Sequence, residues 1–594
     1  MSERKGILSR PEYQVVYEKD ALTVPMRDGA RLMADLYLPK GPGPWPVLVE
    51  RTPYNKETSV ELTVKSPPFF ASRGYAVVFQ DVRGRFKSEG EFYPFRDDGW
   101  GANRDGYDTV EWLAAQKWCN GKVATMGGSY SGHTQYSLAP TAPPHLTTQF
   151  VRESVADYHD GWVYRGGALE LGFGLRWAVS HTFNNETHLP AGPDGARTRG
   201  VLASAVKELP DWYRFLPLAE MPLLRGLSDW WYEWLAHPDD GPYWWQWNVS
   251  ARHPDVETPI YHLGGWFDTF LQGTLDNFTG ISTRARSPRA RNGQRLIIGP
   301  WPHGPQNVAV SRWGDFDFGP EAVQDFNELR LPWYDYWLKG IDSGLMAEPP
   351  ARIFTMGANR WQCFDTWPPR DTRDVKLYFS GGRASSTDSL NDGRLIDDVP
   401  RGIEGADSYL YDPADPVDTL GGSTLGSSDP GPIDQRRVEP RCLTYTSEPL
   451  ATVIEVSGRV KAVLFAMSSA PDTDWVVRLC DVHPDGASRL VAEGILRARY
   501  RESAAVQRLL TPGQVYSFEV DLWSTSNVFL PGHRVRVAVT SSCFPRWDRN
   551  LNTGGPFGLE AEGRPAVNTV LRDRFRASHI VLPVRPAVAY KPVN

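Results

Sequence analysis

The first 150 residues alternate short apolar runs with segments in which apolar residues recur at helical spacing. The runs PVLVERTPY and YAVVFQDVRG end in turn residues, a pattern typical of buried parallel strands. Ahead of them, Asp28 and Gly29 separate two alternating segments and predict a β-hairpin. The segment GYDTVEWLAAQKW predicts a helix with Asp108 as its N-cap. This order of elements predicts an α/β fold.

The pattern changes twice further along the chain. From about residue 151 to residue 245 the strand-like alternation fades and Leu, Trp and Ala recur at helical spacing, which predicts a helical insertion. The runs TPIYHL and QRLIIG then predict two more buried strands. From about residue 350 onward, short alternating runs are separated by turn residues. That spacing predicts an all-β sandwich or jelly roll.

Composition narrows the class of protein. The chain has 594 residues, too many for one core, and a formal net charge of −7, which argues against a surface for nucleic acid or anionic membranes. No run of about 18 apolar residues occurs, and the N-terminal residues lack a signal-peptide core. The five cysteines are scattered without a CxxC pair, which favours free thiols in a reducing compartment. We therefore expect a cytosolic protein that binds neither nucleic acid nor membranes.

The candidate chemistry begins at VATMGGSYSGH (residues 123–133), where four strand-like residues run into two glycines and then Ser129. A serine between a buried strand and a helix, flanked by small residues, is the arrangement of a nucleophile elbow. Ser131 stands where that motif usually has glycine, and Gly132 follows. The alternative is a glycine-rich turn between strand and helix without catalytic function.

A nucleophilic serine needs a base and an acid, in the chain order Ser, Asp, His for an α/β-hydrolase. Asp268 comes just after the predicted strand PIYHL, and His303 comes just after the predicted strand RLII. Both lie at carboxyl ends of strands, where sites form in open α/β sheets. No HExxH pair, Walker loop or GxGxxG motif occurs, so we expect no metal and no cofactor.

An oxyanion site needs hydrogen-bond donors aimed at the developing negative charge. The backbone N–H of Tyr130, the residue after the candidate nucleophile, is one candidate. The phenol of Tyr54, in the loop VERTPYNKE after an early strand, is a second. From the residues alone, Tyr54 could equally be an aromatic packed in that loop. The 23 tryptophans, many of them between residues 228 and 248, fit either core packing or an aromatic wall around an apolar ligand.

Several blocks of the chain resemble the bacterial cocaine esterase family, the CocE/NonD hydrolases, which are related to X-Pro dipeptidyl peptidases and α-amino acid ester hydrolases. The resemblance covers nearly the whole chain apart from the helical insertion. It is carried in order by RTPYNK, GYAVVFQDVRGRFKSEGEF, GGSYSG, GGWFDTF, IGPWPHG, YDPADPV, LTYTSEPL, APDTDWVVRLCDVHPDG, LRARYRES and FPRWDRNLNTGG. It implies an α/β-hydrolase catalytic domain at 1–150 and 246–348, a helical cap at 151–245, and a jelly-roll domain at 349–594.

The resemblance also implies roles for particular residues. It implies a catalytic triad of Ser129, Asp268 and His303, with oxyanion donors at the Tyr54 hydroxyl and the Tyr130 amide. It further suggests an apolar acyl pocket, for which we expect four residues: Trp162, Trp177, Phe270 and Leu425. The same resemblance suggests a homodimer.

The residues after Asp268 favour one branch of substrates. The stretch 269–272 contains no carboxylate, and a buried substrate ammonium would need a paired anion. We therefore predict a serine esterase for an apolar or aromatic acyl group. The alternative is an acylase or peptidase acting on amides or α-amino acid esters, whose substrate amine is held by a cap carboxylate such as Asp157, Asp160 or Glu170.

Overall fold

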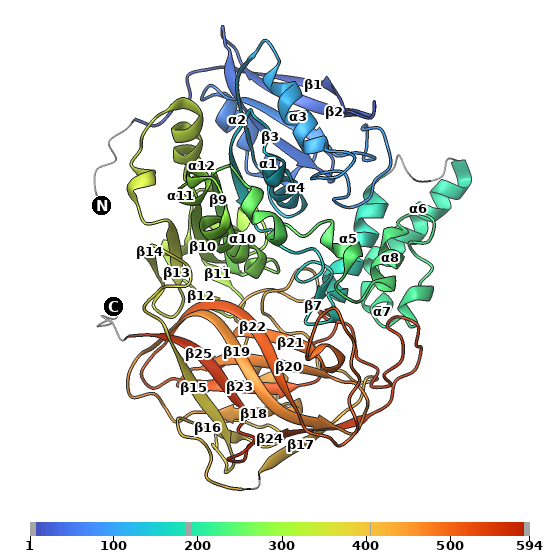
Figure 1. Cartoon of the computed structure of the whole chain (residues 1–594), viewed down its shortest axis with the longest axis vertical. Helices are drawn as coiled ribbons and strands as arrows, with labels where there is room; N and C mark the ends of the chain where they lie inside the picture. The colour runs from blue at the N-terminus through green and yellow to red at the C-terminus, as the bar shows by residue number, and fades with distance from the viewer. Residues whose placement is uncertain (1–6, 186–188, 190–191, 404, 587–594) are drawn as a thin grey trace.

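The computed structural model describes residues 7–185, 189, 192–403 and 405–586. It has three parts: an α/β domain, a group of helices beside it, and a β-domain beneath both (Figure 1). The predicted fold class, an α/β-hydrolase core followed by an all-β domain, is confirmed.

The α/β domain is built on one sheet, which has ten strands within the described residues. The strand order is β1-β2-β4-β3-β5-β6-β9-β10-β13-β14, parallel from β4 to β13 and antiparallel at both ends. The strands are β1 (Val15–Pro25), β2 (Arg31–Pro39), β3 (Trp45–Thr52), β4 (Ala76–Asp81), β5 (Cys119–Thr125), β6 (Leu146–Arg152), β9 (Ile260–Phe267), β10 (Arg295–Pro302), β13 (Ala351–Thr355) and β14 (Arg360–Phe364). The hairpin predicted at Asp28-Gly29 joins β1 to β2.

Helices connect these strands. They are α1 (Val60–Thr63), α2 (Ser66–Ala71), α3 (Asp105–Ala114), α4 (Tyr130–Leu138), α10 (Leu271–Arg284), α11 (Pro288–Asn292) and α12 (Phe326–Tyr334). The predicted N-cap of α3 is wrong, because the helix begins at Asp105 and Asp108 lies in its first turn. The Asp108 carboxylate instead pairs with Arg27 at 2.7 Å, a tertiary contact that the local capping pattern does not reveal.

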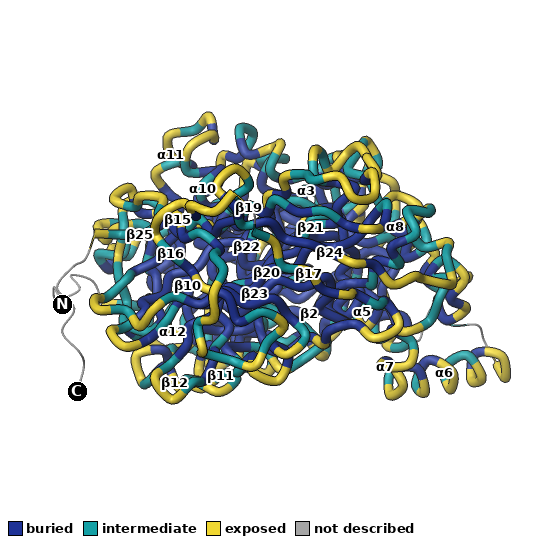
Figure 2. The backbone as a smooth tube through the Cα atoms, turned by 90° about the horizontal axis from the view of Figure 1, so that it is seen from below, coloured by how far each residue is buried: buried dark blue, intermediate teal, exposed yellow. Residues whose placement is uncertain are grey.

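The helical cap contains α5 (Leu171–Asn184), α6 (Gly192–Lys207), α7 (Leu209–Trp212), α8 (Trp230–Ala236) and α9 (Pro242–Trp245), with a small hairpin of β7 (Tyr164–Arg165) and β8 (Ala168–Leu169). Its tryptophans, together with leucines and other aromatic residues, form one buried cluster that reaches the loops of the sheet. Helix α6 lies at the periphery and is largely exposed (Figure 2). Val151 and Arg152, predicted to open the cap, belong to β6 of the core sheet, because the apolar run of that strand continues through them.

The jelly-roll domain follows, with eleven strands in the described chain. They are β15 (Arg373–Ser380), β16 (Gly393–Ile396), β17 (Ala406–Tyr411), β18 (Leu443–Thr446), β19 (Ile454–Ser468), β20 (Asp474–Val482), β21 (Ser488–Arg497), β22 (Tyr516–Phe529), β23 (Arg534–Thr540), β24 (Ala566–Leu571) and β25 (His579–Arg585). Val535, Val537 and Val539 of β23 point into its core, as their period-two spacing requires. The catalytic sheet extends past its predicted end at residue 348, because β13 and β14 belong to it, although their short alternating runs look like those of the jelly roll.

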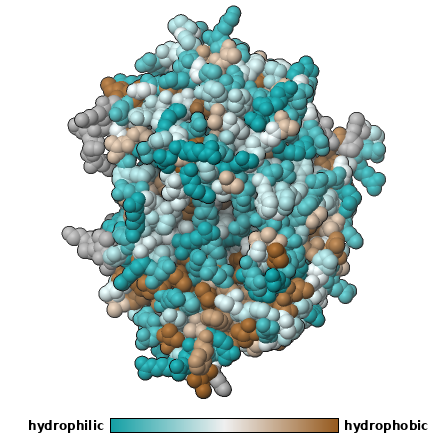
Figure 3. All heavy atoms as spheres, viewed as in Figure 1, coloured by the Kyte–Doolittle hydropathy of each residue, from teal (hydrophilic) through white to brown (hydrophobic). Residues whose placement is uncertain are grey.

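The two domains differ in surface character. On the face shown in Figure 3, hydrophilic residues dominate the α/β half, whereas hydrophobic residues gather over the jelly-roll half. Among the helices that the structure describes, none has the length and apolar character needed to cross a membrane.

Candidate active site

Five neighbouring strands of the core sheet end at the same edge, and each is followed closely by a residue with catalytic chemistry. In the order β3, β5, β6, β9, β10 these residues are Tyr54, Ser129, Glu153, Asp268 and His303. The chain leaves β3 for β4 on one side, while β5 lies on the other side. This makes the carboxyl edge of β3 and β5 a topological switch point, the usual place for a ligand site in an open α/β sheet.

Ser129 occupies a sharp turn between β5 and α4. Its backbone has φ 60° and ψ −123°, a strained conformation for a residue with a Cβ. A Cβ on Gly127 would lie 2.7 Å from the Cβ of Ser131, and a Cβ on Gly132 would lie 2.9 Å from the carbonyl oxygen of Arg152. The turn therefore needs glycine at 127 and 132. The absence of a side chain at Gly127 leaves room for Ser131, which stands where the usual motif has glycine.

The pairing of β9 with β10 brings Asp268 and His303 together. Phe267 lies opposite Pro302, so the next residue on each strand lies beside the other. His303 Nδ1 is 2.8 Å from Asp268 Oδ1, and the carboxylate is fully buried. A ring nitrogen that donates to a carboxylate leaves the other, Nε2, free to accept a proton. The two residues thus have the contact that a base and its orienting acid require.

Glu153, which the sequence analysis did not single out, brings a second carboxylate to His303. Its Oε2 lies 3.4 Å from His303 Nδ1, accepts the Gly304 N–H at 2.8 Å and pairs with the Arg152 guanidinium. Burial raises the pKa of Glu153, whereas the positive charge of Arg152 lowers it. The signal in the sequence was its position: Glu153 directly follows the buried strand β6, as Asp268 follows β9.

Tyr54 lies beside the candidate nucleophile. Its hydroxyl accepts a hydrogen bond from Trp177 Nε1 at 3.1 Å and lies close enough to the Ser129 side chain to influence the Tyr54 pKa. Burial raises the pKa of Tyr54, so the phenol stays protonated and its O–H can donate a hydrogen bond to an oxyanion. The loop after β3 thus places the Tyr54 hydroxyl beside Ser129 as a donor. From the sequence alone, Tyr54 could also have been an aromatic residue that only packs within this loop.

The phenol of Tyr130 is already hydrogen-bonded within the protein. The ring stacks on Phe95 with centroids 4.1 Å apart, and the phenol accepts the Phe95 N–H and donates to Asp98. Tyr130 is also the first residue of α4, where backbone N–H groups have no partner within the helix. Its backbone, rather than its phenol, is therefore the group available to an oxyanion.

Replacement of Tyr54 by phenylalanine is expected to lower kcat by about 10²–10³, the usual cost of one lost oxyanion donor. The ring and its packing remain, so the folded structure and the melting temperature should change little. Steady-state hydrolysis of an aryl ester measures the effect. Unchanged turnover would remove Tyr54 from the oxyanion site.

The predicted pocket residues belong to one aromatic cluster. Phe270 stacks on Trp162 with centroids 4.8 Å apart and makes a T-shaped contact with the His303 ring, with centroids 5.4 Å apart. Trp177 meets Trp162 edge-on at 5.7 Å, and Leu425 packs against the same cluster. Trp162 and Phe270 are almost fully buried within this cluster.

A cavity of about 310 Å³ opens between the Tyr54 loop and α5. It is lined by Tyr54, Asn55, Thr58, Arg85, Phe86, Trp177, Ser180, His181 and Asn184. The guanidinium of Arg85 donates to the carbonyl oxygens of Pro53 and His181 and so ties this loop to the cap. Within the described chain no carboxylate forms an ion pair with Arg85, and burial lowers its pKa to about 9. Of the four predicted pocket residues, only Trp177 lines this cavity.

The cap carboxylates that could hold a substrate amine are engaged or exposed. Glu170 accepts a hydrogen bond from Trp547 Nε1 at 2.9 Å and lies 3.9 Å from the Arg546 guanidinium. Asp157 accepts hydrogen bonds from the His159 N–H and from Asn248. Asp160 is exposed to solvent. Among these three, Glu170 and Asp157 are therefore engaged, whereas the exposed Asp160 does not line the cavity beside Tyr54.

Comparison with known proteins places this arrangement in a family. The X-Pro dipeptidyl-peptidase (S15 family) model matches residues 28–305, and the X-Pro dipeptidyl-peptidase C-terminal non-catalytic domain model matches residues 343–581. Cocaine esterase of Rhodococcus sp. (strain MB1 Bresler) is 39% identical over 574 residues, which cover 94% of this chain and 97% of that protein. The chain belongs to the cocaine esterase family. The similarity to these proteins also confirms the predicted class of the chain, a serine hydrolase.

Two solved structures extend the comparison beyond the cocaine esterase family. An aminopeptidase from the marine sediment archaeon Thaumarchaeota archaeon superimposes with a TM-score of 0.78 at 26% identity and covers 97% of both chains. An α-amino acid ester hydrolase superimposes with a TM-score of 0.76 at 26% identity and covers 98% of both chains. The fold is thus shared by proteins named for ester and for peptide substrates.

Proposed function

We propose that this serine hydrolase cleaves a carboxylic ester with an apolar or aromatic acyl group through an acyl-enzyme on Ser129. One observation carries the proposal: Ser129, on its strained turn, lies beside the Tyr54 hydroxyl at one edge of the sheet. At the same edge, Asp268 Oδ1 lies 2.8 Å from His303 Nδ1. A nucleophile, a base with its orienting acid, and an oxyanion donor are the parts that acyl transfer requires.

The reaction follows from these roles. His303 Nε2 accepts the Ser129 proton as Oγ forms a bond to the ester carbonyl carbon, and Asp268 stabilises the resulting imidazolium. The carbonyl oxygen becomes an oxyanion, which accepts hydrogen bonds from the Tyr54 hydroxyl and the Tyr130 N–H. The intermediate collapses, and the alcohol leaves with the proton from His303. Water, deprotonated by His303, then adds to the acyl-enzyme and releases the acid.

Charge and packing favour a neutral acyl group. The aromatic cluster of Trp162 and Phe270 reaches the His303 ring, which suits apolar or aromatic atoms beside the ester carbon. Arg85 is a buried cation on the cavity next to Tyr54, and it would repel a substrate ammonium group. Both features argue for an ester of an apolar acid over an α-amino acid ester.

The second candidate is hydrolysis of amides or α-amino acid esters by the same triad. It is favoured by the similarity to the aminopeptidase and to the α-amino acid ester hydrolase. It requires an anion for the substrate amine. Glu170 and Asp157 are already occupied by Trp547 and Asn248, so of the three cap carboxylates only the exposed Asp160 is left for this role.

Three substrates with one acyl framework separate these candidates. We expect 4-nitrophenyl phenylacetate to be hydrolysed with a kcat/KM at least about tenfold above that of 4-nitrophenyl phenylglycinate, since tenfold is only about 1.4 kcal/mol. The two esters differ by one amino group, so the comparison isolates the effect of charge. The 4-nitroanilide of phenylacetic acid should be slower than either ester. Faster turnover of the phenylglycinate or of the anilide would favour the second candidate.

Two further expectations from the sequence, a cytosolic location and a homodimer, stay predictions. Size-exclusion chromatography with light scattering measures the second directly.

A further inference from the structure

A cluster of metal-binding side chains lies in the jelly-roll domain, outside the catalytic residues. Asp481 lies near the end of β20, and His483 follows two residues later on the same side of the chain. In the pairing of β20 with β23, Val482 lies opposite Arg534, and one further step places His483 opposite His533. The backbone register therefore brings the two imidazoles and the carboxylate to one end of this strand pair.

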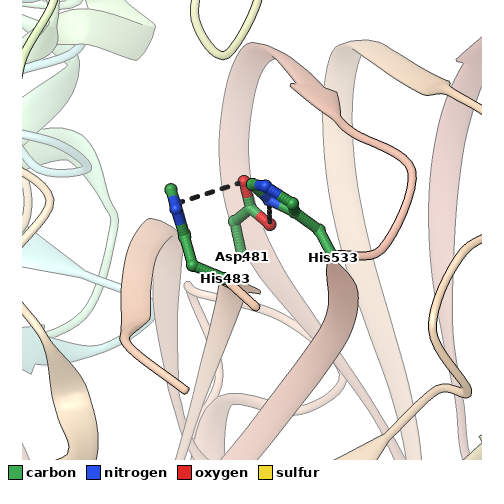
Figure 4. Close-up of side chains that lie close together, drawn as sticks. All are labelled: Asp481, His483 and His533. Atoms are coloured by element: carbon green, nitrogen blue, oxygen red, sulfur yellow. Dashed lines mark hydrogen bonds and ion pairs between the residues drawn. The ribbon is translucent and has the colours of Figure 1, made fainter. Parts of the chain in front are cut away.

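The three side chains converge (Figure 4). His533 Nδ1 is 2.8 Å from Asp481 Oδ1, and His483 Nε2 is 3.8 Å from Asp481 Oδ2. The two rings lie 4.3 Å apart between centroids. One ligand atom from each of the three residues lies within 4.8 Å of the other two.

The cluster lines a cavity of about 200 Å³ between the two domains. The wall on the catalytic side includes Phe267, which directly precedes Asp268, and Phe316 of the short strand β12 (Phe316–Asp317). On the jelly-roll side, His483 and His533 lie among apolar neighbours such as Leu530. Arg489 and Asn527 also line the cavity, and its remaining walls are largely apolar.

We propose that Asp481, His483 and His533 form a zinc site whose fourth position faces this interdomain cavity. Two imidazole nitrogens and one carboxylate oxygen form a typical three-ligand zinc set with an open position. Zn–N and Zn–O bonds of about 2.0–2.2 Å place ligand atoms roughly 3.3 Å apart in a tetrahedron. The present separations bracket that value, so modest rotation of His483, which is half-buried, closes the site.

The charges around the cluster leave room for a cation. Zinc would take the place of the hydrogen bond between Asp481 and His533, because the nitrogen of a ligating imidazole carries no proton. Arg489 lies opposite Asp481 on β21, but its guanidinium lies over the Phe316 ring, 4.8 Å from the centroid. The ion pairs of the described chain include none between Arg489 and Asp481, so the carboxylate is available to a metal.

The site is tested by titrating the metal-free, full-length chain with Zn²⁺ in competition with a chromophoric chelator. The wild type should bind one equivalent at this site. His483→Gln and His533→Gln should each weaken binding by about 100-fold or more, since loss of even an outer partner of a metal ligand costs about 10–100-fold. Co²⁺ substitution should give the visible absorption of a tetrahedral site in the wild type and lose it in both variants.

Two controls make the result specific. His145→Gln changes an exposed histidine of the catalytic domain and should leave Zn²⁺ affinity unchanged. Glu153, Asp268 and His303 form the other group whose ligand atoms lie within 4.8 Å of one another. His303→Gln removes one member of that group and should leave the Zn²⁺ bound at Asp481, His483 and His533 in place.

The His483 and His533 variants should hydrolyse the ester at the wild-type rate, and this activity would show that they fold. If either histidine variant does not fold, Asp481→Asn gives the same comparison, because asparagine keeps the size of the side chain and an oxygen acceptor for His533. Absence of Zn²⁺ binding by the wild type would overturn the proposal. So would full affinity in the ligand variants, or loss of the metal only in His303→Gln.

Discussion

Replacement of Ser129 by alanine lowers kcat for ester hydrolysis by about 10⁶, the loss found when a serine nucleophile is removed from a complete triad. The reason is chemical: alanine has no Oγ to form the acyl-enzyme, while the base and the oxyanion donors remain in place. The substitution also keeps the Cβ in the strained turn, so we expect the variant to fold. The measurement is steady-state turnover of an aryl ester by protein free of wild-type enzyme.

Ser131 supplies the matched control for this variant. It lies two residues further on, and its Cβ packs beneath Gly127 inside the same turn. Alanine at this position keeps that Cβ, so Ser131→Ala should retain turnover within about tenfold, or about 1.4 kcal/mol. A large loss in Ser131→Ala with little loss in Ser129→Ala would place the nucleophile elsewhere.

Replacement of Asp268 by asparagine is expected to lower kcat by about 10⁴, as it does when the acid of a serine protease triad is changed in this way. Asparagine keeps the size of the side chain but can donate to His303 Nδ1, which favours the tautomer with the proton on Nε2. That tautomer cannot accept the Ser129 proton. Turnover of the same aryl ester, measured across pH, reports the loss.

Glu153 offers a matched comparison, since it is the second carboxylate that faces His303. Its oxygen lies 3.4 Å from Nδ1, compared with 2.8 Å for Asp268, and it is already engaged by Arg152 and the Gly304 N–H. We therefore expect Glu153→Gln to lower kcat by less than about tenfold. If Glu153→Gln lost more activity than Asp268→Asn, the orienting role would belong to Glu153.

The sequence predicts the core of this fold because its local signals agree with the final structure. The apolar runs that precede Tyr54, Ser129, Asp268 and His303 are long enough to be buried strands and end in turn residues. In a parallel sheet, residues that follow such strands meet at one edge. The structure brings these four residues to that edge, although strand order, which decides which of them are neighbours, is not written in any local pattern.

What the sequence does not predict depends on contacts between distant segments. Asp108 fits a local cap but pairs with Arg27, 81 residues away. Glu153 follows a strand as Asp268 does, but only the position of β6 between β5 and β9 shows that it faces His303. His483 and His533 are 50 residues apart and lie together only through the pairing of β20 with β23. In each case the role of the side chain depends on a tertiary contact, and the local sequence pattern does not contain that contact.

The most direct test of the central claim is the site of covalent labelling by a fluorophosphonate, which reacts with an activated serine. After stoichiometric labelling and loss of activity, peptide mapping by mass spectrometry should place the adduct on Ser129, and Ser129→Ala should remain unlabelled. An adduct on another residue of the inactivated protein, or full activity after exposure to the probe, would contradict the account.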